Sequence, residues 1–231
     1  MPGPVGLTIW ILGTVFELAF IVCSLVRKSF LRYFALNLYL LLSTSVSIGR
    51  FFILWTYGSR SDQYMYFYYY SDALLTLALF VALISLYSHV LGELRAGEYV
   101  KWGAVFLLLG TAGFSYAVVV QSTRLLSTDF AYELSQNLYF VGLVLTYILW
   151  GAVLKLRETR TRLVQIILSL GLYFSGYAAS YALVNFSGAF GVSRYLCPLL
   201  GCFLPLSWSL TMLRYDDEAR LVPARLVAVP R

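Results

Sequence analysis

Three ionisable residues, Glu17, Arg50 and Asp72, lie within long apolar stretches of this chain. An ionisable side chain in hydrocarbon is costly unless it is paired, hydrogen-bonded or wetted, and such residues commonly mark a binding site or a proton pathway. A carboxyl group can donate or accept a proton, and an arginine beside an aspartate can orient a polar group. We therefore predict that these three side chains contribute to a ligand-binding site.

Glu17 lies about twelve residues into the first apolar stretch, which is roughly 18 Å along a helix and near the middle of a bilayer. An ionised carboxyl is unfavourable at this depth, so we expect it to be protonated or hydrogen-bonded. Two interpretations remain open. Glu17 is either a neutral structural acid bonded to a neighbouring helix, or a group that binds a ligand or relays protons, and in an enzyme it would be the catalytic acid.

Arg50 lies near the end of the second apolar stretch and Asp72 near the start of the third. A short connection between antiparallel helices brings these opposite charges to a similar depth, so the spacing predicts an ion pair. Each residue has an alternative role. Arg50 can extend its side chain to the membrane interface, and Asp72 can cap the N-terminus of the third helix.

Tyr173, Tyr177 and Tyr181 recur at intervals of four, which places them on one face of a helix. Buried tyrosine hydroxyls need hydrogen-bond partners, so this face is expected to point into the bundle. It either packs the core or lines a cavity, and we assign Tyr177 and Tyr181 to the candidate ligand-binding site.

A second group of tyrosines crowds the connection between the second and third apolar stretches: Tyr57, Tyr64, Tyr66, Tyr68, Tyr69 and Tyr70. Tyrosine prefers the boundary between water and hydrocarbon, which favours an interfacial belt. The alternatives are an aromatic rim around a cavity and a contact surface for another membrane protein.

Seven apolar segments position these residues. Of the 231 residues, 60% are hydrophobic and 12% are charged, and the mean hydropathy is +0.77, which does not suit a water-exposed surface. Segments long enough to span a bilayer occur at 5–26, 33–56, 68–91, 102–121, 135–154, 164–186 and 195–214. The sequence therefore predicts an all-α, polytopic integral membrane protein, with one seven-transmembrane-helix bundle over 1–214 and a tail over 215–231.

Lysine and arginine predict the orientation, because short cytoplasmic loops retain positive charge during insertion. Thirteen basic residues fall on the side of the C-terminus: Arg27, Lys28, Arg32, Arg95, Lys101, Lys155, Arg157, Arg160, Arg162, Arg214, Arg220, Arg225 and Arg231. Three fall on the other side: Arg60, Arg124 and Arg194. We therefore predict an outside N-terminus and a cytoplasmic C-terminus, in the plasma or cytoplasmic membrane. The net charge of +6 is then a topology signal rather than a sign of nucleic-acid binding.

The composition also excludes several kinds of chemistry. One histidine and three cysteines cannot supply the ligands of a histidine-based zinc or haem site or of a four-cysteine cluster, so no metal site or cofactor is predicted. The three lysines lie at the ends of segments and not within the last one, which excludes a retinal Schiff base. The first segment has no basic residue before it and is long enough to span, so we expect a helix rather than a signal peptide.

In size and helix count the chain resembles the small membrane-embedded terpene cyclases, which protonate isoprenoid substrates with intramembrane carboxylates. The sequence around Glu17 or Asp72 does not match their acid-bearing motifs, so the resemblance implies only the architecture. Two functions remain. The first is binding of a small or lipid-like ligand in an outward-opening polar and aromatic cavity, as a receptor, carrier, sensory module or accessory subunit. The second is an enzyme acting on an apolar, isoprenoid-like substrate, which requires Glu17 to lie inside a cavity. Binding without catalysis requires only the charged residues nearer the outer side, Arg50 and Asp72, and is preferred.

Overall fold

The computed structural model describes residues 4–58, 61–91, 97–121, 126–155, 161–187 and 190–215. In these ranges the chain forms seven helices: α1 (Pro4–Val26), α2 (Phe34–Tyr57), α3 (Asp62–Leu91), α4 (Gly97–Gln121), α5 (Leu126–Lys155), α6 (Thr161–Ser187) and α7 (Phe190–Arg214). All seven are long and apolar enough to cross a membrane. The prediction of an all-α, seven-helix, multi-pass membrane protein is confirmed. Of the tail expected over 215–231, only Tyr215 lies within the described residues.

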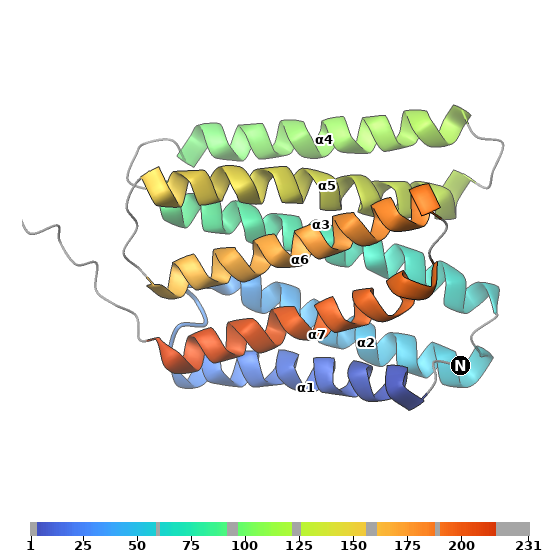
Figure 1. The fold of residues 1–231 in the computed structure, drawn as a ribbon, viewed down its shortest axis with the longest axis horizontal. Coiled ribbons are helices and arrows are strands. Elements are labelled where there is room, and N and C mark those ends of the chain that lie inside the picture. Colours follow the sequence, from blue (N-terminus) through green and yellow to red (C-terminus); the bar gives the residue numbers. More distant parts are fainter. Residues whose placement is uncertain are drawn as a thin grey trace, which may run out of the picture.

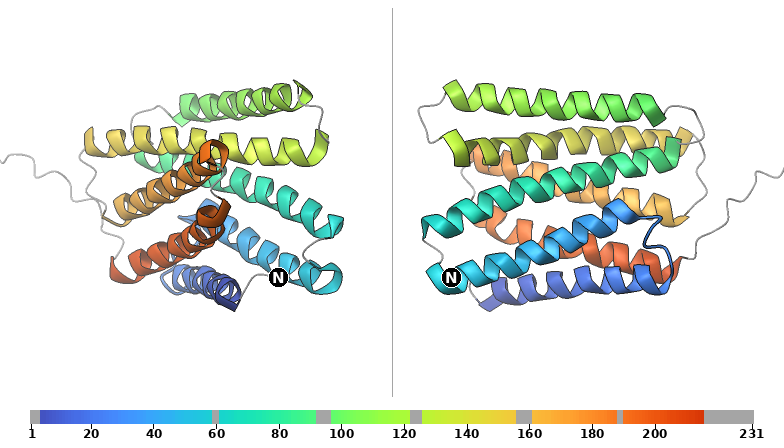
Figure 2. Two further views of the ribbon diagram at one scale, coloured as in Figure 1. Left: turned by 45° about the vertical axis from the view of Figure 1, so that its right-hand side comes forward. Right: turned by 180° about the vertical axis from the view of Figure 1, so that it is seen from behind.

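Six of the helices pack each against the next in a closed ring. Figure 1 shows the helices running alongside one another. Neighbours pack in the order α1, α2, α3, α5, α6, α7, and α7 packs back against α1. The remaining helix, α4, lies outside this ring against α5 and α3 (Figure 2). Because successive helices run in opposite directions, α1, α3, α5 and α7 all begin at the same end. We call this end the entry end of the bundle and the opposite end the exit end.

Several helices are longer than their apolar segments. α3 begins at Asp62 and α5 at Leu126, ahead of the apolar stretches from 68 and 135. Each has 30 residues, or about 45 Å at the helical rise, whereas the hydrocarbon layer is about 30 Å thick. Their first turns therefore have room to project beyond hydrocarbon, where polar side chains carry no penalty. α2 ends where Gly58 adopts φ of 82°, a left-handed conformation that favours glycine.

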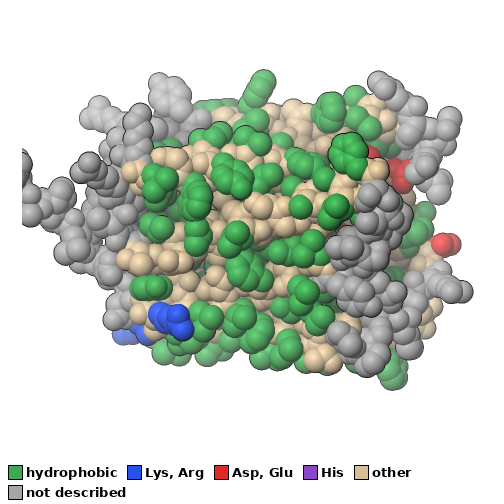
Figure 3. Space-filling model, in the orientation of Figure 1, with side chains coloured by type: hydrophobic (Ala, Val, Ile, Leu, Met, Phe, Trp, Pro, Cys, Tyr) green, Lys and Arg blue, Asp and Glu red, His purple; other side chains and the backbone are tan. Residues whose placement is uncertain are grey.

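Apolar side chains cover the middle of the bundle, whereas the charged ones lie at its ends (Figure 3). Large hydrophobic side chains such as Phe52, Trp55 and Phe106 are more than half exposed, as expected of a surface in contact with lipid. Described basic residues gather at the exit end: Arg27, Lys28, Arg32, Arg162 and Arg214. Described acidic residues on the first turns of α3 and α5 lie at the entry end: Asp62, Asp129 and Glu133.

The exit half of the ring is filled by a packed core around Trp208 on α7. Trp208 is fully buried, and its ring contacts those of Phe20 on α1 and Tyr39 on α2. Its indole N–H donates to the carbonyl of Ile166 on α6 at 3.4 Å. One side chain thus joins four helices in the exit half. The entry half of the ring is not filled in this way.

Candidate functional site

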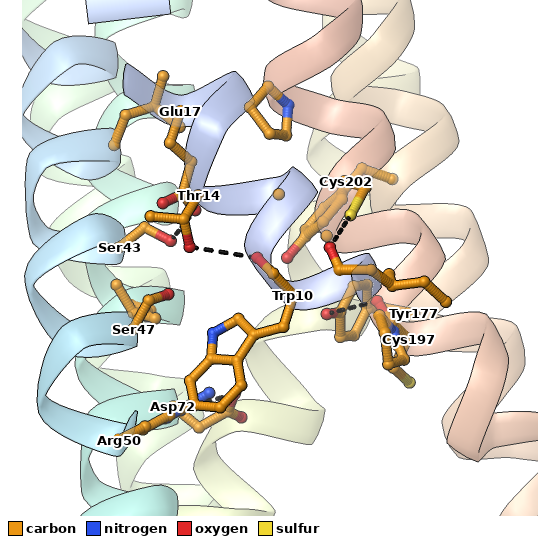
Figure 4. Close-up of a pocket in the computed structure, with 18 of the residues that line it drawn as sticks. Trp10, Thr14, Glu17, Ser43, Ser47, Arg50, Asp72, Tyr177, Cys197 and Cys202 are labelled. Atoms are coloured by element: carbon orange, nitrogen blue, oxygen red, sulfur yellow. Dashed lines mark hydrogen bonds and ion pairs between the residues drawn. The ribbon is translucent and has the colours of Figure 1, made fainter. Parts of the chain in front are cut away.

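The entry half of the ring encloses a cavity of about 520 Å³ (Figure 4). All six ring helices contribute to its wall, and no described residue of α4 does. The cavity extends from Glu17 on α1 toward the entry end, where Gly6 and Tyr64 lie close to the starts of α1 and α3. Polar side chains line it together with aromatic ones, so it differs from the apolar packing around Trp208.

Glu17 lines the deep part of this cavity. It is 7% exposed, and its carboxyl oxygens accept hydrogen bonds from the hydroxyls of Ser43 at 2.5 Å and Thr44 at 3.0 Å. Both donors come from α2, so the prediction of a carboxyl bonded to a neighbouring helix is confirmed. No described lysine, arginine or histidine forms an ion pair with it. Glu17 is therefore at once a structural link between α1 and α2 and a polar group that faces the cavity.

Arg50 and Asp72 lie nearer the entry end and form the predicted ion pair. The Arg50 Nη2 atom is 3.8 Å from Asp72 Oδ1, and the two side chains are 17% and 22% exposed. α3 begins at Asp62, ten residues before Asp72, so the alternative that Asp72 caps this helix is wrong. The sequence missed this because the first turns of α3 are polar and aromatic and fall outside the apolar segment.

The α3 backbone and side chains hold the Arg50 guanidinium in place. Its Nε donates to the Ser71 hydroxyl at 3.0 Å, and Nη2 donates to the Tyr68 carbonyl at 3.1 Å. The guanidinium carbon also lies 4.3 Å from the centre of the Tyr68 ring, a cation–π contact. Arg50 therefore stays at the α2–α3 contact and does not extend to the interface.

Tyrosine rings continue the wall of the cavity across α3, α5 and α6. Eight of them touch in series, and we call them the tyrosine cluster: Tyr64, Tyr68, Tyr69, Tyr132, Tyr181, Tyr139, Tyr177 and Tyr173. The closest stack joins Tyr139 and Tyr177, with centroids 4.6 Å apart and planes 10° from parallel. The Tyr177 hydroxyl donates to the Cys197 carbonyl on α7 at 3.2 Å. The α6 stripe thus points into the bundle, as predicted.

The cavity brings together four of the five candidate ligand-binding residues. Glu17, Arg50, Asp72 and Tyr177 line it. The fifth, Tyr181, is not among the lining residues, and its ring packs between those of Tyr132 and Tyr139. Tyr181 supports the wall from behind through the tyrosine cluster.

Sequence reasoning missed the residues that complete the site. Ser43 and Thr44 begin the polar run Ser-Thr-Ser-Val-Ser of α2, and such a run in an apolar helix is a signal for a buried partner. Tyr139 on α5 gave no such signal, because a single tyrosine in an apolar stretch has no periodicity. Its position in the stack depends on how α5 and α6 pack.

Neither a known protein family, a curated protein nor a solved structure matches this chain. Among the described residues, no three His, Cys, Asp or Glu side chains come together in a way that would hold a metal ion. The groups that line the cavity are carboxyls, a guanidinium, hydroxyls and aromatic rings.

Proposed function

We propose that this membrane protein binds a small or lipid-like ligand in the cavity, as a receptor, carrier, sensory module or accessory subunit of a larger membrane complex. One observation carries the proposal. A cavity with two carboxyls, a guanidinium and seven aromatic side chains lies inside a closed ring of membrane helices. Its volume of about 520 Å³ falls within the range of roughly 300–1,000 Å³ that is usual for ligand pockets.

The contrast between the two halves of the bundle supports this proposal. Around Trp208 large apolar and aromatic side chains fill the ring, and the polar groups buried near them, such as Ser209 and Asn37, are uncharged. Around Glu17 and the Arg50–Asp72 pair it places ionisable groups and leaves space between the helices. Ionisable groups at membrane depth are costly, and a ligand that they recognise gives them a role.

We further propose that the entry end faces outside. The thirteen-to-three excess of basic residues supports it. Many of these residues, including Arg60, Arg95, Arg124, Arg157 and Arg160, lie outside the described part of the chain, but the described ones agree. Arg27, Lys28, Arg32, Arg162 and Arg214 all belong to the exit end. The cavity then takes its ligand from the outer side.

A cavity-filling substitution tests the ligand-binding proposal. Gly201 lines the cavity, and a Cβ added there meets no atom within 4 Å, so Gly201→Leu places a side chain in the space without a clash at the backbone. Native mass spectrometry of gently extracted protein should show a bound small molecule or lipid on the parent chain and loss of it in Gly201→Leu. Gly151→Leu is the matched control, since Gly151 on α5 also has free space around it but does not line the cavity. A bare mass for the parent chain, or equal retention in both variants, would contradict the proposal.

A second candidate function is acid catalysis on an apolar, isoprenoid-like substrate. The observation in its favour is that Glu17 lines the cavity together with Tyr139 and Tyr177. A protonated Glu17 would transfer its proton to a substrate double bond, and the aromatic faces would stabilise the resulting cation before a proton is lost again. Incubation with a linear isoprenoid should then yield cyclised isomers, and Glu17→Gln should abolish them. Product formation that is unchanged in Glu17→Gln would assign Glu17 a structural role.

A further inference from the structure

The charges that line the cavity do not balance within the described chain. Two carboxyls, Glu17 and Asp72, face one guanidinium, Arg50. Arg50 is paired with Asp72 at 3.8 Å, and Glu17 has only the hydroxyls of Ser43 and Thr44. Hydroxyl donors stabilise a carboxylate but do not neutralise it, and an uncompensated charge at this depth is unfavourable. Glu17 is therefore expected to stay protonated unless a cation lies beside it, and a cationic ligand would supply that partner.

Arg50 is poorly placed to receive an anionic ligand instead. Its Nε is bonded to Ser71 and its Nη2 to the Tyr68 carbonyl, and the guanidinium lies over the Tyr68 ring. An anion would have to compete with these acceptors and with the Asp72 carboxylate.

The remaining wall is suited to a positive charge. Seven aromatic side chains line the cavity: Trp10, Tyr39, Tyr64, Tyr68, Tyr139, Tyr173 and Tyr177. The faces of aromatic rings attract ammonium-type groups, most strongly where water is excluded. Apolar side chains such as Ile9, Leu40 and Leu75 complete the wall, so a ligand with an apolar body is accommodated beside its charge.

The two charged positions also lie at different depths. Ser43, which holds Glu17, and Arg50 are seven residues apart on α2, or about 10 Å along the helix. Figure 4 shows Glu17 beside Ser43 at one level and the Arg50–Asp72 pair at the other, with Trp10 extending toward the pair. A ligand cation at the deep level is thus separated from the guanidinium.

We propose that the ligand is an amphipathic organic cation whose ammonium-type group lies between Glu17 and the aromatic wall. This inference rests on the proposed ligand-binding function and adds the charge of the ligand to it. Glu17 is the counter-charge, the aromatic rings surround the cation, and the Arg50–Asp72 pair lies toward the entry end with its charges already balanced. A neutral or anionic ligand of the same size lacks the contact with Glu17.

Two ions of nearly equal size and opposite charge test the inference. Tetraphenylphosphonium and tetraphenylborate share four phenyl groups and differ in the sign of their charge. The purified full chain in detergent is titrated with each, and ligand-dependent thermal stabilisation and quenching of tryptophan fluorescence are measured. We expect tetraphenylphosphonium to bind and to stabilise the protein, and tetraphenylborate at the same concentrations to have no saturable effect.

Variants identify the groups responsible. Glu17→Gln should weaken apparent tetraphenylphosphonium affinity by about tenfold or more, because it removes the counter-charge. Glu133→Gln removes the same charge from α5 outside the cavity lining and should leave the affinity unchanged. If Glu17→Gln fails to fold, Trp10→Leu against Trp10→Phe provides a second test, since only the former removes an aromatic face. We expect loss of affinity in Trp10→Leu and retention in Trp10→Phe.

The outcomes separate this inference from the ligand-binding proposal. Binding of both ions with equal affinity, or binding that survives both Glu17→Gln and Trp10→Leu, overturns the cationic ligand. If the parent chain retains a co-purified neutral or anionic molecule and Gly201→Leu loses it, the ligand-binding proposal stands. The inference of a cationic ligand is then overturned. Absence of binding by either ion, combined with a bare mass for the extracted parent chain, overturns both.

Discussion

At the scale of single residues, the partners of a buried polar group decide its contribution. Glu17 and Asp72 are both carboxyls inside the bundle, yet Glu17 has two hydroxyl donors and Asp72 has a guanidinium at 3.8 Å. Removal of one partner leaves the other desolvated, which costs more than the intact interaction contributes. Each pairing therefore makes a distinct prediction about stability.

The Arg50–Asp72 pair is expected to behave as a coupled unit. Arg50→Ala and Asp72→Ala should each destabilise the protein, and the double variant should be less destabilised than their sum, with a coupling free energy of about 0.5–3 kcal/mol. Thermal unfolding in detergent of the two single variants and the double variant gives this quantity. Arg50→Ala combined with Asp62→Ala is the control, because Asp62 lies at the start of α3 and should add independently. Simple additivity of Arg50→Ala and Asp72→Ala would mean that the two side chains do not interact.

The hydroxyl donors of Glu17 are expected to contribute to stability. Ser43→Ala combined with Thr44→Ala leaves the buried carboxyl without these donors and should cost about 1–3 kcal/mol in the free energy of unfolding. Glu17→Gln should preserve folding, because an amide has nearly the same shape and still accepts a hydrogen bond. The control is Ser45→Ala, whose exposed hydroxyl bonds only to the Leu41 carbonyl of its own helix. Collapse of folding in Glu17→Gln would indicate an ionised carboxylate that needs a cation for stability.

The sequence predicted the depth of these residues and the pairing of Arg50 with Asp72, but not the hydroxyl donors of Glu17. Counting along apolar stretches placed Glu17 near the middle of the membrane and brought Arg50 and Asp72 to similar depth, because helical rise converts residue number into distance. Ser43 lies 26 residues from Glu17 along the chain, and the contact depends on how α1 and α2 are rotated. Rotation is set by packing across the whole interface, which no local pattern reveals.

At the scale of helices, close contacts explain why particular glycines occur. Gly142 on α5 faces the ring of Phe174 on α6, and a Cβ at this position would overlap the ring. Phe174 is 1% exposed and has little space to move. The α5–α6 contact, which carries the Tyr139–Tyr177 stack, therefore requires glycine here.

Gly142→Ala should destabilise the protein by about 1–3 kcal/mol, since overpacking forces a shift of Phe174 or of the two helices. Gly151→Ala on the same helix is the matched control, because a Cβ there meets nothing within 4 Å and helix propensity favours alanine. The midpoint of thermal unfolding in detergent distinguishes the two. Equal midpoints for both variants would show that Phe174 relaxes freely and that the contact is loose.

Helix number was predictable from hydropathy, whereas helix length was not. The apolar windows marked all seven spans because the membrane penalises any charge within about 20 residues. The same rule says nothing of turns that extend into water, so it omitted the first turns of α3, which carry Tyr64, a lining residue of the cavity. The sequence showed that tyrosines are frequent between the second and third apolar segments. Only the structure shows that they lie on helices.

At the scale of the whole molecule, ring closure creates the cavity. The wall is complete only because α7 packs back against α1, where the Cys202 thiol donates to the Ile9 carbonyl at 2.9 Å and the Ser209 hydroxyl to the Phe16 carbonyl at 3.2 Å. Seven spans in a sequence are compatible with many arrangements, and the exclusion of α4 from the ring was not predictable. No described residue of α4 lines the cavity.

Orientation decides from which side the proposed ligand would reach the cavity. The charge distribution predicts that the entry end is outside. Single cysteines at Ser61, just before α3, and at Thr161, the first residue of α6, probe opposite ends of the bundle. The free cysteines Cys23, Cys197 and Cys202 are first replaced by serine, so that the reagent labels only the introduced cysteine. Two of them, Cys197 and Cys202, line the cavity. A membrane-impermeant thiol reagent should label Ser61→Cys in intact cells and Thr161→Cys only after permeabilisation. The opposite pattern would place the cavity on the cytoplasmic side, and an external ligand would then have to be replaced by one from the cell interior or the inner leaflet.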